Sequence, residues 1–96
     1  MSHKRRVVIT GLGMISPLAT GVEKSWQKII NGQSGIGKID LFDTSNVSCS
    51  IAGQVKFGNN EGEFNPDNFI DPKEQRKMDR FIHFAIGAAE EAMLIS

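Results

Sequence analysis

Residues 5–17 read Arg-Arg-Val-Val-Ile-Thr-Gly-Leu-Gly-Met-Ile-Ser-Pro, an apolar β-branched run followed by a glycine-rich segment. The apolar run has no polar alternation, which predicts a strand over residues 5–10 that is covered on both faces, as in the middle of an α/β sheet. Gly11 and Gly13 end this strand or turn it sharply, and Ser16-Pro17 marks a loop. We therefore expect an α/β fold that begins with a buried strand.

The glycine-rich segment raises the question of dinucleotide binding. In dinucleotide-binding proteins the helix begins directly at the glycines, so that its N-terminus meets the pyrophosphate. Here Ser16 stands in place of the third glycine, Pro17 follows, and the helix signal begins only near Thr20. The pattern favours a tight structural turn over a nucleotide site, and we expect no cofactor.

The next segment carries the signals of an amphipathic helix. Thr20 as N-cap and Glu23 three residues later form a capping box, and Gly32 is placed to end the helix at the C′ position. One apolar stripe follows at helical spacing: Val22, Trp26, Ile29 and Ile30. We expect this stripe, including Trp26, to lie in the core. Residues 33–43 are predicted as a loop, and the alternation over residues 50–57 predicts a second, half-buried strand.

The last helix has the clearest start, with Asp71 as N-cap, Pro72 at the first helical position and Glu74 at the third. It is predicted to run without interruption into the C-terminal segment. Its apolar side comprises Met78, Phe81, Ile82, Ala85, Ala89, Ala92 and Met93, and the remaining circumference is largely small or apolar as well. Such a helix is typical of one buried in a larger body. We expect the chain alone to fold partly or to aggregate, with Phe81, Ile82 and Ile86 exposed.

Four basic side chains share one face of this predicted helix: Lys73, Arg76, Lys77 and Arg80. Positive charge is unfavourable near a helix N-terminus, because the helix dipole is already positive there. A sequence that accepts this cost often has an anionic partner. The alternative is a solvated helix face on which Glu74 pairs locally with Lys77.

Composition limits the classes of function. The chain has 96 residues, with 11 basic and 11 acidic side chains and a formal net charge of zero. This balance argues against a general nucleic-acid or membrane binder. The single cysteine excludes an intrachain disulfide and favours a reducing, cytoplasmic setting. The sequence contains no apolar run long enough for a membrane span and no signal-peptide core, so we expect no membrane association.

Few residues are candidates for chemistry. Cys49 has no predicted helix N-terminus or cation beside it, so a structural or exposed thiol is favoured over a nucleophile. His3 lies at the terminus, and His83 on an apolar helix is typical of a partly buried histidine with its hydrogen bonds satisfied. These residues do not form a metal-binding constellation.

Several segments together resemble the start of a type II β-ketoacyl-[acyl-carrier-protein] synthase. They are residues 5–17, Trp26, Gly32-Gln-Ser-Gly-Ile36, Phe42-Asp-Thr44, Ala52-Gly53 and Lys73-Glu-Gln-Arg-Lys-Met-Asp79. The opening segment is shared widely among ketosynthases, whereas the run from Lys73 to Asp79 favours the type II branch. The resemblance covers essentially the whole chain in register, although residues 17–21 differ slightly from the family's usual turn.

The resemblance implies a thiolase-like αβαβα fold, of which residues 1–96 would be an incomplete N-terminal fragment of the first half. It implies a homodimer at full length and elongation of acyl chains by decarboxylative Claisen condensation with malonyl-acyl carrier protein. By motif position, Lys73, Arg76 and Lys77 would dock the acyl carrier protein, while Arg80 extends the basic stripe by geometry alone.

The family's catalytic cysteine and two histidines correspond to positions beyond Ser96, so the resemblance assigns no catalytic residue to this chain. We therefore expect residues 1–96 alone to have no condensing activity. Two alternatives stay open. One is a fragment of a polyketide-type ketosynthase, and the other is a small stand-alone protein that binds acyl carrier protein.

Overall fold

The structure, a computed structural model, describes residues 4–96, so His3 lies outside the described part of the chain. Its elements in order are α1 (Val22–Ile30), β1 (Ile36–Lys38), β2 (Ile51–Gly53), the 3₁₀ helix η1 (Pro66–Asn68), α2 (Pro72–Gln75) and α3 (Arg80–Ile95). The mixed helix and strand content predicted from the sequence is confirmed.

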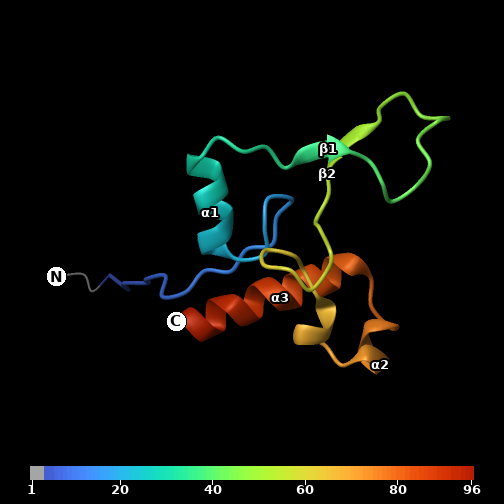
Figure 1. Ribbon diagram of the computed structural model, residues 1–96. Coiled ribbons are helices and arrows are strands. Elements are labelled where there is room, and N and C mark those ends of the chain that lie inside the picture. Colours follow the sequence, from blue (N-terminus) through green and yellow to red (C-terminus); the bar gives the residue numbers. More distant parts are fainter. Residues whose placement is uncertain (1–3) are drawn as a thin grey trace.

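The molecule is elongated around helix α3. Helix α1 and the β1–β2 pair lie on one side of α3, and α2 precedes it at the opposite end of the molecule (Figure 1). The chain measures 65 × 38 × 26 Å, with a radius of gyration of 16.9 Å. A compact domain of about 100 residues has a radius of gyration of about 13 Å. The chain is therefore less compact than a typical domain of this length and buries a smaller share of its surface.

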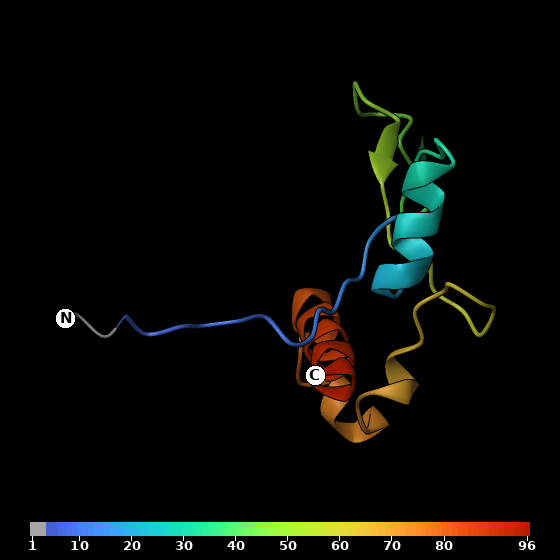
Figure 2. The same ribbon diagram turned by 90° about the vertical axis from the view of Figure 1, so that its left-hand side faces the viewer.

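The buried strand predicted at residues 5–10 does not form. These residues follow an extended path away from the rest of the molecule (Figure 2). Val7, Val8 and Ile9 are each at least 70% exposed. A strand is stabilised by hydrogen bonds to a neighbouring strand, and the described part of the chain places none beside this segment. The prediction of a covered strand is therefore wrong for this structure.

The two glycines of the opening segment pack directly on helix α3. A Cβ atom on Gly13 would overlap the carbonyl oxygen of Ala88, and one on Gly11 would overlap that of Ala92. The turn itself comes slightly later, where the backbone N–H of Ser16 donates to the carbonyl of Ala19 at 3.0 Å. The glycines thus act in close packing, which agrees with the structural role that the sequence favours.

Helix α1 has the predicted extent but a different N-terminus. Its N-cap is Gly21, with φ of 111°, and no side chain caps it, so the predicted capping box is wrong. Instead the backbone N–H of Val22 donates to Glu91 Oε2 of α3 at 2.9 Å. At the other end Gly32, with φ of 71°, is the predicted C′ residue. It forms a Schellman motif, in which its own N–H and that of Gln33 donate to carbonyls of the last turn.

Strands β1 and β2 pair antiparallel, with Gly37 opposite Ala52. The loop prediction for residues 33–43 is therefore wrong at β1, and the strand predicted at 50–57 is shorter than expected. The predicted burial of this strand is also wrong in part, because Ile51 is 57% exposed. The pair rests on Pro17, whose ring lies against both Gly35 and Gly53.

The long helix predicted from Pro72 onward is broken in two. Asp71 is the N-cap of α2 as predicted, and its carboxylate accepts a hydrogen bond from the N–H of Lys73 at 3.1 Å. The helix ends after one turn, however, and α3 begins at Arg80 after a turn at residues 76–78. The prediction of one continuous helix is therefore wrong.

The core is a small aromatic cluster. Phe64 is fully buried. Its ring stacks on Phe69 with centroids 5.6 Å apart and meets Phe84 at 5.3 Å and Phe57 at 5.6 Å, both edge to face. Trp26, expected in the core, is 55% exposed, so that prediction is wrong.

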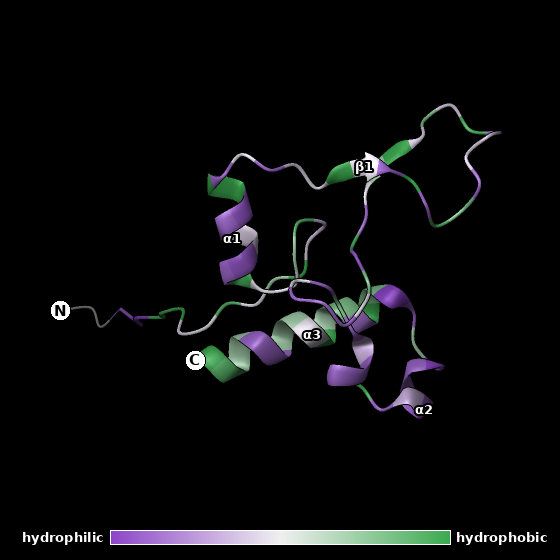
Figure 3. Cartoon of the chain, viewed as in Figure 1, coloured by the Kyte–Doolittle hydropathy of each residue, from purple (hydrophilic) through white to green (hydrophobic). Residues whose placement is uncertain are grey.

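Much apolar surface stays open elsewhere, including the C-terminal turns of α3 (Figure 3). Within residues 4–96 no helix combines the length and the hydropathy that a membrane crossing requires.

Candidate functional site

The four predicted site residues lie along one short stretch of chain, here called the basic segment (Lys73, Arg76, Lys77 and Arg80). Lys73 is in α2, Arg76 and Lys77 are in the following turn, and Arg80 is the first residue of α3. All four side chains are exposed, and α2 stands out as a hydrophilic element in Figure 3. Because the helix is broken between them, they do not share one helical face as predicted.

Two side chains fix the backbone of the basic segment. The side-chain amide of Gln75 donates to Asp67 Oδ1 and to the carbonyl of Ile70, both at 2.8 Å, which holds α2 against η1. The Nε2 of His83, a buried residue, donates to the carbonyl of Gln75 at 3.2 Å, which holds the end of α2 against α3. The expectation of a histidine with satisfied hydrogen bonds is confirmed, and His83 is more deeply buried than the partial burial that was expected. Its role in placing the basic segment, and that of Gln75, was not predicted from the sequence.

The four cations differ in their surroundings. Lys77 Nζ lies 3.5 Å from Glu74 Oε1, which confirms the predicted local pair. Both side chains are mostly exposed, so the pair contributes little stability. The guanidinium carbon of Arg80 lies 4.7 Å from the centre of the Phe57 ring. Within the described chain, Lys73 and Arg76 have no carboxylate at ion-pair distance.

Acidic side chains also occur in this stretch, which limits its excess of positive charge. Asp71 precedes the basic segment, and Glu74 and Asp79 lie within it. Of these, Asp71 is engaged as the N-cap of α2. On an exposed surface with charges of both signs, electrostatic attraction mainly speeds the encounter with an anionic partner and orients it. Salt screens this attraction strongly.

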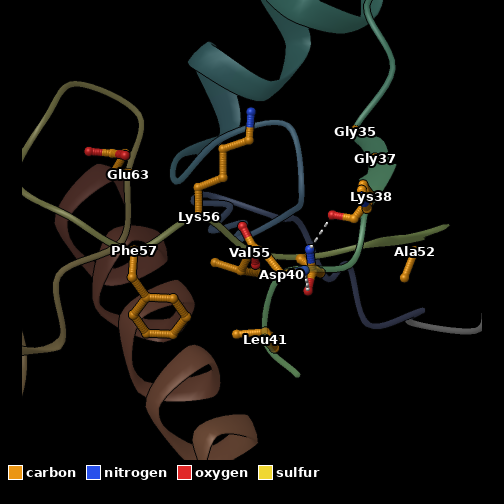
Figure 4. Close-up of a pocket in the computed structure, with 11 residues that line it drawn as sticks. Gly35, Gly37, Lys38, Asp40, Leu41, Ala52, Val55, Lys56, Phe57 and Glu63 are labelled. Carbon is orange, nitrogen blue, oxygen red and sulfur yellow. Dashed lines mark hydrogen bonds between the residues drawn. The ribbon is translucent and has the colours of Figure 1, made fainter. Parts of the chain in front are cut away.

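A separate hollow lies between the β1–β2 pair and the segment after β2. It has a volume of about 450 Å³ and combines an apolar part, Leu41, Val55 and Phe57, with two lysines and two acids: Lys38, Lys56, Asp40 and Glu63. In Figure 4 the side chains of Leu41 and Phe57 extend toward each other, and Lys56 points away from them. The opposite charges balance, and the lining holds no cysteine, histidine or serine. The hollow therefore shows no preference for a charged ligand and no cysteine, serine or histidine that could act as a nucleophile.

The remaining chemically active residue is Cys49. It is exposed, and its Sγ–H donates to the carbonyl of Ile51 at 3.3 Å. A carbonyl is not a base that activates a thiol, so the geometry gives Cys49 no catalytic partner. Across residues 4–96 no three histidine, cysteine, aspartate or glutamate side chains gather where a metal ion could be held.

Comparison with known proteins matches nearly the whole chain to one family. The model of the family described as "Beta-ketoacyl synthase, N-terminal domain" matches residues 4–95. The chain is 44% identical over 90 residues to "3-oxoacyl-[acyl-carrier-protein] synthase 2" of Rhizobium meliloti, which covers 93% of this chain and 21% of that protein. It is 46% identical over 90 residues to the protein of the same name from Vibrio cholerae, covering 94% of this chain and 20% of that protein.

A third relative gives the same result. The protein named "3-oxoacyl-[acyl-carrier-protein] synthase 2" from Synechocystis is 42% identical over 91 residues, which cover 95% of this chain and 20% of the relative. The chain therefore spans about a fifth of the length of the curated relatives that it matches.

Proposed function

Because the chain belongs to the β-ketoacyl synthase family, we propose that it serves as the part of a 3-oxoacyl-[acyl-carrier-protein] synthase that meets the acyl carrier protein. The curated relatives carry this activity in their names. The observation that carries the proposal is the basic segment. It presents four exposed cations on a backbone held by Gln75 and His83, and three of the four (Lys73, Arg76 and Arg80) have no ion-pair partner within the described chain.

The proposed reaction is the decarboxylative condensation of the family. An enzyme cysteine holds the acyl group as a thioester, and the malonyl group on the carrier loses carbon dioxide. The carbanion that results attacks the thioester carbonyl, so that a carbon–carbon bond forms and the cysteine sulfur leaves. Cys49 lacks an activating base, so we assign no catalytic step to residues 4–96. We expect the 96-residue chain to transfer no acyl group.

Three finer features of the whole protein belong to the same proposal. We propose a thiolase-like αβαβα fold in which residues 1–96 form part of the first half, and a homodimeric assembly. The large apolar surface that the chain leaves open supports both. We also propose a cytoplasmic location, which fits the free thiol of Cys49.

The test is binding of purified acyl carrier protein to the 96-residue chain, measured by titration calorimetry at several salt concentrations. We expect weak binding that falls steeply with salt, because exposed charges carry it. Reversing two charges in the variant Lys73→Glu/Arg76→Glu should weaken binding at least about tenfold, which corresponds to about 1.4 kcal/mol.

The matched control is Lys38→Glu, an exposed lysine on β1 at the far side of the molecule from α2 (Figure 1). This variant also replaces a positive charge by a negative one, but it does so outside the basic segment. It should therefore leave binding nearly unchanged. Equal losses in Lys38→Glu and in the double variant would show non-specific attraction. The proposal would then fail, as it would if the unaltered chain showed no binding at low salt.

A further inference from the structure

Arg80 is held differently from the other cations of the basic segment. Its guanidinium lies over the face of the Phe57 ring, with 4.7 Å between the guanidinium carbon and the ring centre. Phe57 is far from Arg80 in the sequence and belongs to the segment that follows β2. This contact therefore joins the start of α3 to a distant part of the chain.

Two other aromatic rings hold the Phe57 ring in place. It meets Phe64 edge to face at 5.6 Å and Phe84 at 5.8 Å, and Phe64 is fully buried. The backbone at the same point forms a bridge, in which Phe57 pairs with Phe64. Arg80 covers part of the ring that these contacts leave open, and the residue Phe57 is still 39% exposed. Phe57 is thus a platform that the aromatic core holds in place.

The cation–π contact constrains the guanidinium and is not itself one of its hydrogen bonds. Arginine has five N–H donors, so donors of the guanidinium stay available to a carboxylate. Fixing the side chain beforehand also reduces the conformational entropy that binding would otherwise remove. By contrast, Lys77 lies beside Glu74, whose carboxylate competes with any anionic partner.

We propose that Phe57 is a positioning residue that holds Arg80 as an oriented arginine for a carboxylate of the acyl carrier protein. This inference rests on the proposed function. It gives Arg80 a defined part in the docking surface, where the family motif supports only Lys73, Arg76 and Lys77. It also gives a part to an aromatic residue that carries no charge and lies outside the basic segment.

The test combines binding with a spectroscopic measurement on the 96-residue chain. Phe57→Leu should weaken binding of the acyl carrier protein about two- to five-fold, the factor that corresponds to an exposed cation–π contact. Because Arg80 stays charged in this variant, the salt dependence of binding should be nearly unchanged. Arg80→Gln should weaken binding and also reduce its salt dependence. The ring-current shift of the Arg80 side-chain protons in the NMR spectrum should disappear in Phe57→Leu.

The double variant Phe57→Leu/Arg80→Gln separates positioning from a general loss of structure. If Phe57 acts through Arg80, adding Phe57→Leu to Arg80→Gln should cause no further loss of binding. Phe69→Leu is the matched control, since it removes an aromatic contact to Phe64 and leaves Arg80 on its ring. It should bind the carrier as the unaltered chain does.

Other outcomes overturn the inference. It fails if Phe57→Leu weakens binding by the same factor in the Arg80→Gln background as in the unaltered chain. It also fails if Phe69→Leu weakens binding as much as Phe57→Leu does. If Lys73→Glu/Arg76→Glu abolishes binding while Phe57→Leu and Arg80→Gln leave it unchanged, only the role of Phe57 and Arg80 is refuted. If the unaltered chain does not bind at low salt, the proposed function fails and the inference fails with it.

Discussion

Gly13 shows how one residue sets the contact between the opening segment and α3. Its Cα lies so close to the helix that a Cβ would overlap the carbonyl oxygen of Ala88. The position therefore needs glycine for space. A backbone carbonyl cannot turn aside as a flexible side chain can, so any added methyl group must push the two segments apart.

We expect Gly13→Ala to destabilise this contact by about 1–3 kcal/mol, the usual cost of overpacking. Amide hydrogen exchange of α3 in the 96-residue chain measures the effect, because separation of the segments leaves the helix less protected. Gly37→Ala is the control, since nothing lies within 4 Å of a Cβ at that position. Equal exchange in the two variants would refute the packing role of Gly13.

At the scale of elements, Glu91 connects α3 to the beginning of α1. Its Oε1 accepts the backbone N–H of Met14 at 2.8 Å, and its Oε2 accepts that of Val22 at 2.9 Å. The second contact places a carboxylate at the N-terminus of α1, where negative charge is favourable. The Glu91 carboxylate therefore accepts a hydrogen bond from the first turn of α1, the role that the sequence assigned to a capping box at Thr20 and Glu23. It does so from a distant element, α3.

Glu91→Ala should therefore destabilise α1 by about 1.5–3 kcal/mol, the range for hydrogen bonds to a charged group. Far-UV circular dichroism should report the loss of helix, and amide exchange should place that loss at α1. Glu90→Ala is a suitable control, because Glu90 is exposed on the same helix and has no hydrogen bond to α1 in the structure. If the two variants lost equal helix content, Glu91 would have no special part in joining the helices.

The elements that depend on local sequence were predictable, and those that depend on distant contacts were not. The end of α1 at Gly32 follows from a glycine that adopts a positive φ, and the start of α2 follows from Asp71 and its neighbours. The break before α3 was missed because it involves His83 reaching back to the carbonyl of Gln75. A helical pattern read along the chain contains no sign of that contact.

The same division holds for the candidate site. Its four cations are visible in the sequence, because they lie within one short stretch. Their arrangement was not predictable, since Arg80 rests on Phe57 from a different part of the chain. The hollow beside β1 was missed for a related reason. Strand β1 is short and glycine-containing, so local composition predicts a loop there, and pairing with β2 makes it a strand.

For the whole molecule, exposed surface is the dominant property. The accessible surface is 7622 Å². A compact protein of the same mass, 10.5 kDa, exposes about 5,400 Å². The excess is of the size that obligate partners bury in an interface. It lies on several elements, among them the extended residues 7–9, α1 at Trp26 and the end of α3 at Leu94.

This excess predicts weak and poorly cooperative folding of the 96-residue chain. Ordering the backbone costs about 1–2 kcal/mol per residue, and burial around Phe64 recovers only part of that because the described core is small. Urea unfolding followed by circular dichroism should be broad, with a low slope and a midpoint near the lowest urea concentrations. A dye that binds exposed apolar surface should fluoresce in the absence of urea, and its signal should rise with protein concentration as chains associate. A sharp transition of the monomer, with a well-dispersed amide NMR spectrum and no dye binding, would contradict this. It would mean that the aromatic cluster around Phe64 suffices to fold the chain without further covering surfaces.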